Sequence, residues 1–165
     1  MLTAGAKAPE FDLADIEGGR RTLSEALQTG PLILAFFALD CQTCEISYLH
    51  WDRIHVHYAE AGGQLWAISL DTPEDARAFV ERSGVEFPVL LDEDLELVRR
   101  FGPVSTPAMF LVARDGSIAA SHEGFERAAL NQMSAGLAEH TGLPPVEIAA
   151  GEAPELRPGC TIHGL

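Results

Sequence analysis

The stretch LDCQTCE holds two cysteines, Cys41 and Cys44, with Asp40 before the first and Glu45 after the second. A thiolate attacks a disulfide to give a mixed disulfide, and a second thiol nearby can then release the product. A pair with this spacing could instead bind a metal ion or remain inert. The acidic neighbours oppose ionisation of the thiols, because a like charge disfavours the charged form.

The residues around this pair predict its place in the fold. The run PLILAFFALD, residues 31–40, is almost wholly apolar and indicates a central strand covered on both faces. Residues 41–61 contain no Gly or Pro and predict one long helix. Cys41 would then lie at the helix N-terminus, where unpaired N–H groups and the helix dipole favour a thiolate. Cys44 would lie one turn further on, more buried and suited to resolving the mixed disulfide.

Strand and helix patterns alternate along the rest of the chain. QLWAISLD predicts a second buried strand, and TPED predicts the start of a helix from Thr72 to about Ser83. The sequence RDGS between apolar runs indicates a hairpin, and a last helix covers about residues 126–140. Helix crossovers imply parallel strands. We therefore predict an α/β mixed sheet flanked by helices over residues 1–142, followed by an extended, Pro-rich C-terminal tail, residues 143–165.

The long helix after the cysteines should also show which of its residues face the sheet. We expect Ile46, Leu49, Ile54 and Tyr58 to be among its inward positions.

Composition excludes several classes of partner. The 165-residue chain has 11 Lys and Arg against 25 Asp and Glu, a formal net charge of −14, which opposes binding to nucleic acid and to anionic membranes. No apolar run approaches the ~20 residues of a membrane-spanning helix. The opening MLTAGAKAPEFDL lacks the pattern of a secretory signal. We expect a soluble, cytoplasmic protein, and the sequence favours neither a monomer nor a dimer.

Taken together, these motifs resemble the thioredoxin superfamily. The segments LILAFFALDCQTC, VSTPAMFLVARDGSI and GAKAPEFDLADIEGGRRTLSEAL are similar to its branch of thiol-disulfide oxidoreductases and alkyl-hydroperoxide-reductase-like redoxins. The resemblance covers nearly the whole chain apart from the tail. It implies that Pro107 is cis and faces Cys41, and that the backbone of Thr106 pairs with an extended substrate strand. It also assigns Gln42 and Thr43 to the substrate-binding surface.

The resemblance implies a thiol-disulfide oxidoreductase in which Cys41 attacks and Cys44 resolves. Protein disulfides would be its substrates and a further thiol its electron donor. No cofactor would be needed, because the disulfide itself carries the electrons. Asp40 departs from the family, where an aromatic residue is usual before the first cysteine. Asp40 and Glu45 are the candidates for tuning the thiol pKa and for accepting the proton of Cys44.

The charges near Cys41 predict its ionisation. A helix terminus favours the thiolate by ~0.3–1 kcal/mol, and an adjacent surface carboxylate opposes it by a similar order. Because the two effects should largely cancel, we expect Cys41 to have a pKa near that of an ordinary thiol or of thioredoxin, and the protein to be reducing.

Alternatives remain open. Cys160 and His163 in the tail, together with Cys41 and Cys44, could provide four ligands to zinc or copper. Cys160 could instead be a third thiol that relays electrons to or from Cys41 or pairs with another chain. RPGCTIHG resembles the ending of some redoxin-branch proteins. A peroxiredoxin-like peroxidase is a weaker alternative, because neither paired cysteine has the Thr three residues and the Pro seven residues before it. A non-catalytic interaction module would keep the same fold.

Overall fold

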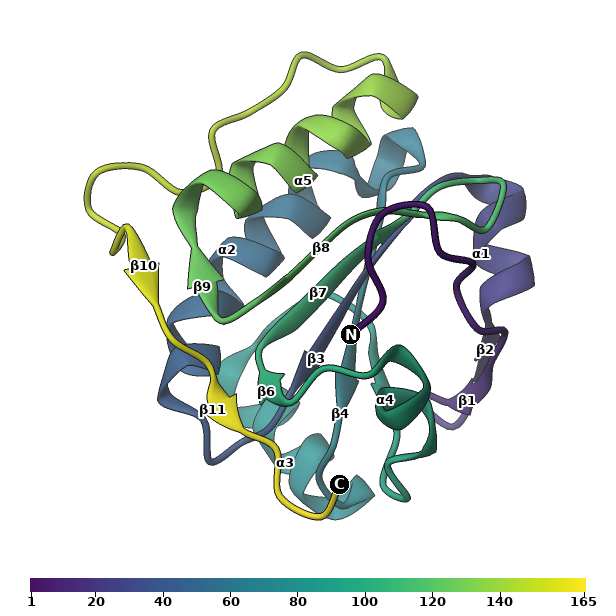
Figure 1. Ribbon diagram of the computed structural model, residues 1–165, viewed down its shortest axis with the longest axis vertical. Coiled ribbons are helices and arrows are strands. Elements are labelled where there is room, and N and C mark those ends of the chain that lie inside the picture. The colour runs from purple at the N-terminus through teal and green to yellow at the C-terminus, as the bar shows by residue number, and fades with distance from the viewer.

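A five-stranded sheet forms the centre of the computed structural model, which describes residues 1–165 (Figure 1). The strand order is β5-β4-β3-β7-β8. The strands are β3 (Leu32–Phe37), β4 (Gln64–Ser69), β5 (Val89–Leu91), β7 (Ala108–Val112) and β8 (Ile118–Glu123). Strands β3, β4 and β5 run parallel, whereas β7 and β8 pair antiparallel to their neighbours. The predicted mixed sheet is confirmed.

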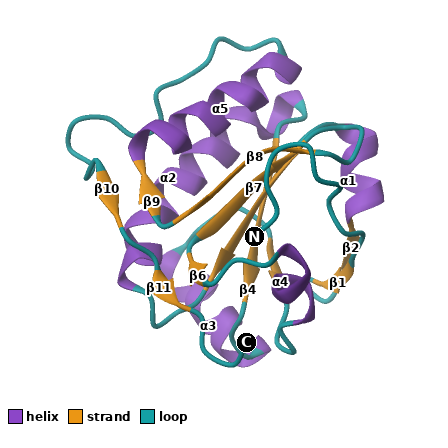
Figure 2. Ribbon diagram, in the orientation of Figure 1, coloured by secondary structure: helices purple, strands orange, loops and turns teal.

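Helices cover both faces of this sheet (Figure 2). One face packs against α2 (Gln42–Tyr58), α3 (Pro73–Ser83) and α5 (Arg127–Thr141). The other packs against α1 (Leu23–Thr29) and α4 (Glu96–Phe101). The remaining elements are β1 (Asp12–Ala14), β2 (Arg20–Thr22), η1 (Ala59–Ala61), β6 (Ser105–Thr106), β9 (Phe125–Glu126), β10 (Leu156–Arg157) and β11 (Cys160–Thr161). None of the helices combines the length and the apolar character needed to cross a bilayer.

Strand β3 shows why its sequence is uninterruptedly apolar. All six of its residues are 0% exposed. Ile33, Ala35 and Phe37 face the core beneath α2, α3 and α5, and the alternate residues face the core on the other side. A polar residue anywhere on β3 would therefore lie in one of two apolar layers. The strand ends at Phe37, and Cys41 follows four residues later.

Helix α2 begins just after Cys41 and continues into the short 3-10 turn η1, which ends at Gly62 with φ +90°. Its inward stripe includes Cys44, Trp51, Ile54 and Tyr58, all fully buried. Leu49 is 59% exposed, so its predicted inward position is wrong. The reason is the helical period: Leu49 lies between the inward turns set by Cys44 and Trp51, on the opposite side of the helix.

The tail, residues 143–165, returns along the domain surface and forms two short strands (Figure 1, yellow-green to yellow). Strand β10 pairs antiparallel with β9, and β11 pairs antiparallel with β6. Ile148 and Ala149 join the core beside α2 and α5, and Ile162 joins the core on the other side of the sheet. The side chain of Asn131 accepts hydrogen bonds from the N–H groups of Ile148 and Ala149 at 2.8 and 3.0 Å. The tail is thus extended, and it packs against the domain through Ile148, Ala149, Ala153 and Ile162.

Candidate active site

Cys41 is the N-cap residue of α2. Its backbone is extended, and its Sγ accepts a hydrogen bond from the N–H of Cys44 at 3.2 Å. The turn that leads into the helix is held by Asp71, whose carboxylate accepts from the N–H of Leu39 at 2.9 Å. An N-cap side chain accepts a hydrogen bond from a free N–H group of the first helical turn, and it lies at the positive end of the helix dipole. This position therefore stabilises a negative charge on the Cys41 sulfur.

The ionisation of Cys41 differs from the sequence-based expectation. A hydrogen bond with the Cys44 thiol is the largest cause of the shift, and the pKa of Cys41 falls to about 5 although burial opposes this change. The Cys160 thiol and Thr106 lower the pKa further through hydrogen bonds. Burial raises the pKa of Cys44, which keeps that thiol protonated. The two sulfurs therefore differ in charge at neutral pH, as an attacking and a resolving thiol should.

The expected near-ordinary pKa of Cys41 is wrong for a spatial reason. Asp40 and Glu45 are next to the cysteines in sequence, but both side chains are exposed. Water screens exposed charges strongly. Cys41 is only 1% exposed, and hydrogen bonds from the Cys44 thiol, the Cys160 thiol and the Cys44 N–H lower its pKa more than burial raises it. Hydrogen bonds to a charged group favour ionisation more than distant, solvated carboxylates oppose it.

The loop before β7 completes the site. The Thr106–Pro107 peptide bond is cis, as expected from the resemblance. Thr106 is 1% exposed, and its carbonyl oxygen accepts a hydrogen bond from the Cys41 thiol at 3.2 Å. The residue expected to pair with a substrate strand thus lies in contact with the Cys41 sulfur.

The tail covers the edge that a substrate strand would use. Cys160 lies directly opposite Thr106 in the antiparallel pairing of β11 with β6. The hydroxyl of Thr43 donates to the carbonyl of Pro158 at 2.7 Å. Two residues assigned to substrate contact, Thr43 and Thr106, therefore contact the tail, whereas Gln42 faces solvent.

The metal alternative gains no support from this geometry. His163 is exposed. The structure holds no group of three or more His, Cys, Asp or Glu side chains arranged to bind a metal ion. Cys41, Cys44 and Cys160 are all free thiols. The fold places all three near Thr106: the Cys41 thiol donates to its carbonyl, Cys44 donates its N–H to Cys41, and Cys160 lies opposite Thr106. We call these three residues the cysteine cluster.

Two residues at the site did not emerge from the sequence. Asp71 follows β4, and its position at the sheet edge next to the end of β3 is where parallel strands gather functional side chains. Burial raises the pKa of the Asp71 carboxyl. The hydroxyl of Tyr48 is buried without a hydrogen-bond partner. Burial, followed by the charges of Cys44 and Cys41, raises the pKa of Tyr48, which places that hydroxyl in the field of the two sulfurs. An acid directly after a buried strand was the one available signal for Asp71.

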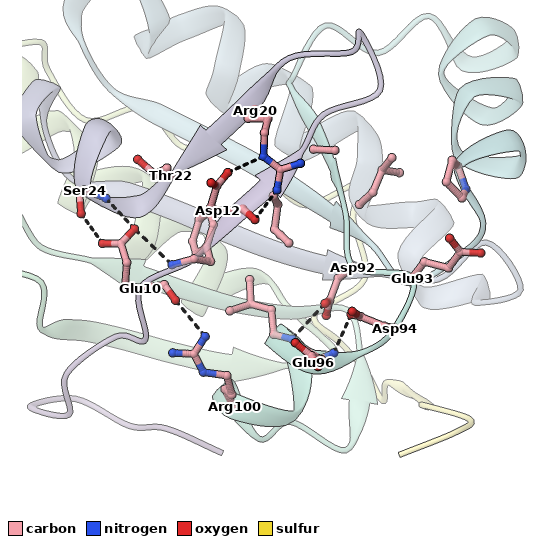
Figure 3. A pocket seen from close by; sticks show the side chains of 16 residues that line it. Glu10, Asp12, Arg20, Thr22, Ser24, Asp92, Glu93, Asp94, Glu96 and Arg100 are labelled. Atoms are coloured by element: carbon pink, nitrogen blue, oxygen red, sulfur yellow. Dashed lines mark hydrogen bonds and ion pairs between the residues drawn. The ribbon is translucent and has the colours of Figure 1, made fainter.

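A broad surface cavity of about 960 Å³ lies elsewhere, between the β1–β2 hairpin and α4 (Figure 3). None of the three cysteines lines it. Several of its polar side chains already have partners: Arg20 donates to the Asp12 carboxylate at 2.8 Å, and Arg100 donates to the Glu10 carbonyl at 2.9 Å. Asp92 accepts from two N–H groups in the first turn of α4 at 3.0 and 2.8 Å. These contacts are structural, so the cysteine cluster remains the candidate site.

Comparison with known proteins is consistent with this site. A sequence profile of the AhpC/TSA family matches residues 4–121. The thiol-disulfide oxidoreductase ResA of Halalkalibacterium halodurans is 31% identical over 125 residues, which cover 75% of this chain and 70% of that protein. A solved structure from Chlorobium tepidum, assigned as thiol:disulfide interchange protein DsbE, is 29% identical with a TM-score of 0.77 and covers 86% of this chain and 100% of its own.

A second solved structure resembles the chain over its whole length. It is a hypothetical protein of Sinorhizobium meliloti 1021, 24% identical with a TM-score of 0.77, and the match covers 98% of this chain and 94% of that one. At this identity the likeness concerns the fold alone.

Proposed function

This chain belongs to the AhpC/TSA family and is a thioredoxin-like thiol-disulfide oxidoreductase, and we propose that its chemistry is carried by the Cys41–Cys44 pair. Cys41 is the nucleophile and Cys44 the resolving thiol, and the substrates are disulfides of other proteins. The observation that carries this proposal is the contrast between the two sulfurs. Cys41 holds a stabilised thiolate at the end of α2, whereas Cys44 stays protonated one turn further in.

The reaction begins when the Cys41 thiolate attacks one sulfur of a substrate disulfide. The Cys41–substrate bond forms, and the other substrate sulfur leaves as a thiolate that takes up a proton. Cys44 then attacks Cys41, the Cys41–substrate bond breaks, and the proton of Cys44 passes to the departing substrate sulfur. The substrate gains two electrons and two protons, and the protein keeps a Cys41–Cys44 disulfide. A small or protein thiol must reduce this disulfide to complete the cycle, so no cofactor takes part.

The site also has the means to bind an extended peptide. Thr106 presents its backbone at a sheet edge, where main-chain hydrogen bonds bind a strand with little dependence on its sequence. The Thr106 carbonyl is 3.2 Å from the Cys41 sulfur, so a disulfide on a strand paired there would lie next to the nucleophile. We propose that Gln42, exposed in the first turn of α2, contacts such a substrate.

A redox titration of the Cys160→Ser protein tests this function, because only Cys41 and Cys44 then remain. The protein is equilibrated with mixtures of reduced and oxidised dithiothreitol, quenched with acid and alkylated. We expect the two thiols to disappear and reappear together as one two-electron couple. Thiols that titrate separately, or never form a reversible disulfide, would refute the proposal.

The protein with both Cys44 and Cys160 replaced by Ser supplies the complementary test. It should accumulate mixed disulfides through Cys41, because the resolving step is missing. The same protein with Cys41 also replaced by Ser is the matched control and should trap nothing.

A further inference from the structure

The C-terminal strand β11 occupies the place where a substrate strand is expected. Its register sets Cys160 opposite Thr106 and Thr161 opposite Ser105, antiparallel. Directly opposed residues in such a pair have Cα atoms about 4.5–5.5 Å apart, so their side chains are neighbours. Thr106 is the residue whose carbonyl is 3.2 Å from the Cys41 sulfur. The pairing therefore places Cys160, the one thiol of the tail, next to Thr106.

Contacts on both sides of Cys160 hold it there. Before it, the carbonyl of Pro158 accepts the hydrogen bond from Thr43, one of the two residues between the paired cysteines. After it, the N–H of Ile162 donates to the Val104 carbonyl at 3.0 Å, and the Ile162 side chain is only 7% exposed. Cys160 is itself half-buried and packs against the core that contains Cys41. The thiol of a loose tail would have no such fixed position.

Gly159 shows how closely the tail fits. A Cβ atom at this position would lie 2.6 Å from Ser105 Oγ and 2.9 Å from the Thr106 carbonyl oxygen. Gly124, between β8 and β9, is equally close to the tail: a Cβ there would lie 2.6 Å from the Arg157 carbonyl oxygen. Real Cβ atoms do not approach backbone atoms at such distances, so the backbones meet only because both residues are glycine. This close approach brings Cys160 against β6.

We propose that Cys160 is a third redox-active thiol, which exchanges with the Cys41–Cys44 disulfide while β11 serves as an internal substrate strand. This inference rests on the proposed function and adds a residue to it. The register sets Cys160 opposite Thr106, whose carbonyl is 3.2 Å from the Cys41 sulfur. The Cys160 thiol also lowers the pKa of Cys41 in the reduced protein, as a neighbouring group would.

The exchange balances without an outside oxidant. In the oxidised protein, the Cys160 thiolate attacks the Cys41 sulfur, the Cys41–Cys160 bond forms and the Cys41–Cys44 bond breaks. Cys44 leaves as a thiolate and takes up the proton that Cys160 has lost. One disulfide is present before and after, so no electrons leave the protein. Attack of Cys44 on Cys41 reverses the step and frees the tail.

The product would differ from the Cys41–Cys44 form in one important way. A Cys41–Cys160 bond fixes the tail covalently over the Thr106 edge, so an external strand cannot pair there. Cys44 is then a free, buried thiol. The exchange would therefore set how much of the oxidised protein is open to protein partners.

Oxidation of the Cys44→Ser protein with glutathione disulfide tests this inference. Glutathione disulfide converts Cys41 to a mixed disulfide with glutathione, and Cys160 should displace the glutathione to give an intramolecular Cys41–Cys160 bond. After alkylation, trypsin cleavage at Arg53 and Arg127 places the two cysteines in different peptides. Mass spectrometry of the monomer should show those peptides linked in more than half of the protein.

A displaced thiol is the matched control. Thr161→Cys in a Cys44→Ser and Cys160→Ser background keeps one tail thiol on the same tether, but successive strand residues point to opposite faces. We expect at least tenfold less linkage in this control. Cys41 that stays bound to glutathione in the Cys44→Ser protein would overturn the inference, as would equal linkage in the control.

Failure of this inference is distinguishable from failure of the proposed function. The titration of the Cys160→Ser protein tests the Cys41–Cys44 couple without the tail thiol. A reversible couple there, with no Cys41–Cys160 linkage in the Cys44→Ser protein, would refute only the role of Cys160. Loss of the couple in the Cys160→Ser protein would refute the proposed function itself.

Discussion

The hydroxyl of Thr43 donates a 2.7 Å hydrogen bond to the carbonyl of Pro158, 115 residues further along the chain. This bond joins the first turn of α2, between the paired cysteines, to the segment just before Cys160. The first turn of α2 therefore contacts the chain's own C-terminal segment. The predictions below follow from this connection and from the ionisation of the sulfurs.

Replacing Thr43 by Val should loosen the tail without changing the shape of the side chain. A net hydrogen bond contributes about 0.5–1.5 kcal/mol, so local opening should increase roughly 2- to 10-fold. The N–H of Ile162 is bonded to Val104 and reports on docking of the tail. Hydrogen exchange at Ile162 should accelerate by that factor in the Thr43→Val protein and stay unchanged in Thr43→Ser, which keeps the hydroxyl. Equal exchange rates in all three proteins would show that the bond contributes nothing to docking.

The thiolate of Cys41 should be detectable well below neutral pH. Thiolate absorbance at 240 nm in the reduced protein should follow a pKa of about 5 for Cys41, against an ordinary value of about 8.5. Cys44→Ala should raise the pKa of Cys41 most, because the Cys44 thiol is the largest cause that lowers it, and Cys160→Ala should raise it less. Asp40→Asn should leave the pKa nearly unchanged, because Asp40 is exposed. A large downward shift in Asp40→Asn would restore the expectation drawn from the sequence.

The stability of the reduced protein should depend on pH through the same group. The pKa of Cys41 is about 5 when folded and higher when unfolded, so between these values the unfolded state binds more protons. The free energy of unfolding should therefore rise as pH increases from about 5 towards 8.5, and this stabilisation should be lost as pH falls through 5. Burial lowers the pKa values of His50 and His122, which add a slope of the same sign below pH 6.5. Urea denaturation of the reduced protein and of Cys41→Ser separates the two contributions, and parallel pH profiles would contradict a stabilised thiolate.

The fold was predictable because its signals are local. Each element is indicated by neighbouring residues: an apolar run for β3, a stretch without Gly or Pro for α2, and the sequence VSTP before β7. The order of these elements along the chain then implies the sheet. The place of the tail was not predictable. Cys160 pairs with Thr106 across more than fifty positions, through strands of two residues each, and no periodicity in the tail marks them. The prediction for Leu49 was wrong for a different reason. The buried residues of α2 define which side of the helix faces the sheet, and Leu49 lies on the other side although it is apolar.

The difference between local and long-range contacts also explains why the ionisation of Cys41 was not predictable. The sequence predicted that an adjacent carboxylate would largely cancel the effect of the helix terminus, but the side chains of Asp40 and Glu45 are both exposed to solvent. The groups that decide the charge are Cys44, one helical turn away, and Cys160 from the far end of the chain. The effect of one group on the pKa of another depends on the distance between them and on their burial. A sequence pattern does not give these quantities until the fold is known.

The redox potential should also differ from the reducing value expected from the sequence. Stabilising the Cys41 thiolate stabilises the reduced form, which makes the disulfide more oxidising. The potential of the Cys41–Cys44 couple should lie between about −270 mV, the value for thioredoxin, and about −120 mV, the value for DsbA. Equilibration of the Cys160→Ser protein with glutathione buffers measures it. A value more negative than that of thioredoxin would mean that the oxidised form gains stability elsewhere in the fold.

Gly159 offers the sharpest test of how the tail docks. Gly159→Ala would set a Cβ 2.9 Å from the Thr106 carbonyl oxygen, and overpacking of this kind costs about 1–3 kcal/mol. Because the tail can move away while the core stays folded, the strain should appear as undocking of β11. Alkylation of Cys160 by iodoacetamide should then accelerate roughly 5- to 100-fold, following that energy.

Gly151→Ala is the matched control for this substitution. Gly151 lies in the same tail, and a Cβ there would meet nothing within 4 Å. The alkylation rate of Cys160 in this variant should equal that of the unmodified protein. Under the proposed function the tail must also leave Thr106 before a protein substrate pairs with it, so Gly159→Ala should accelerate the reaction with a protein disulfide more than the reaction with a small one. Equal acceleration with both substrates would indicate a change at Cys41 itself and would exclude undocking as the cause.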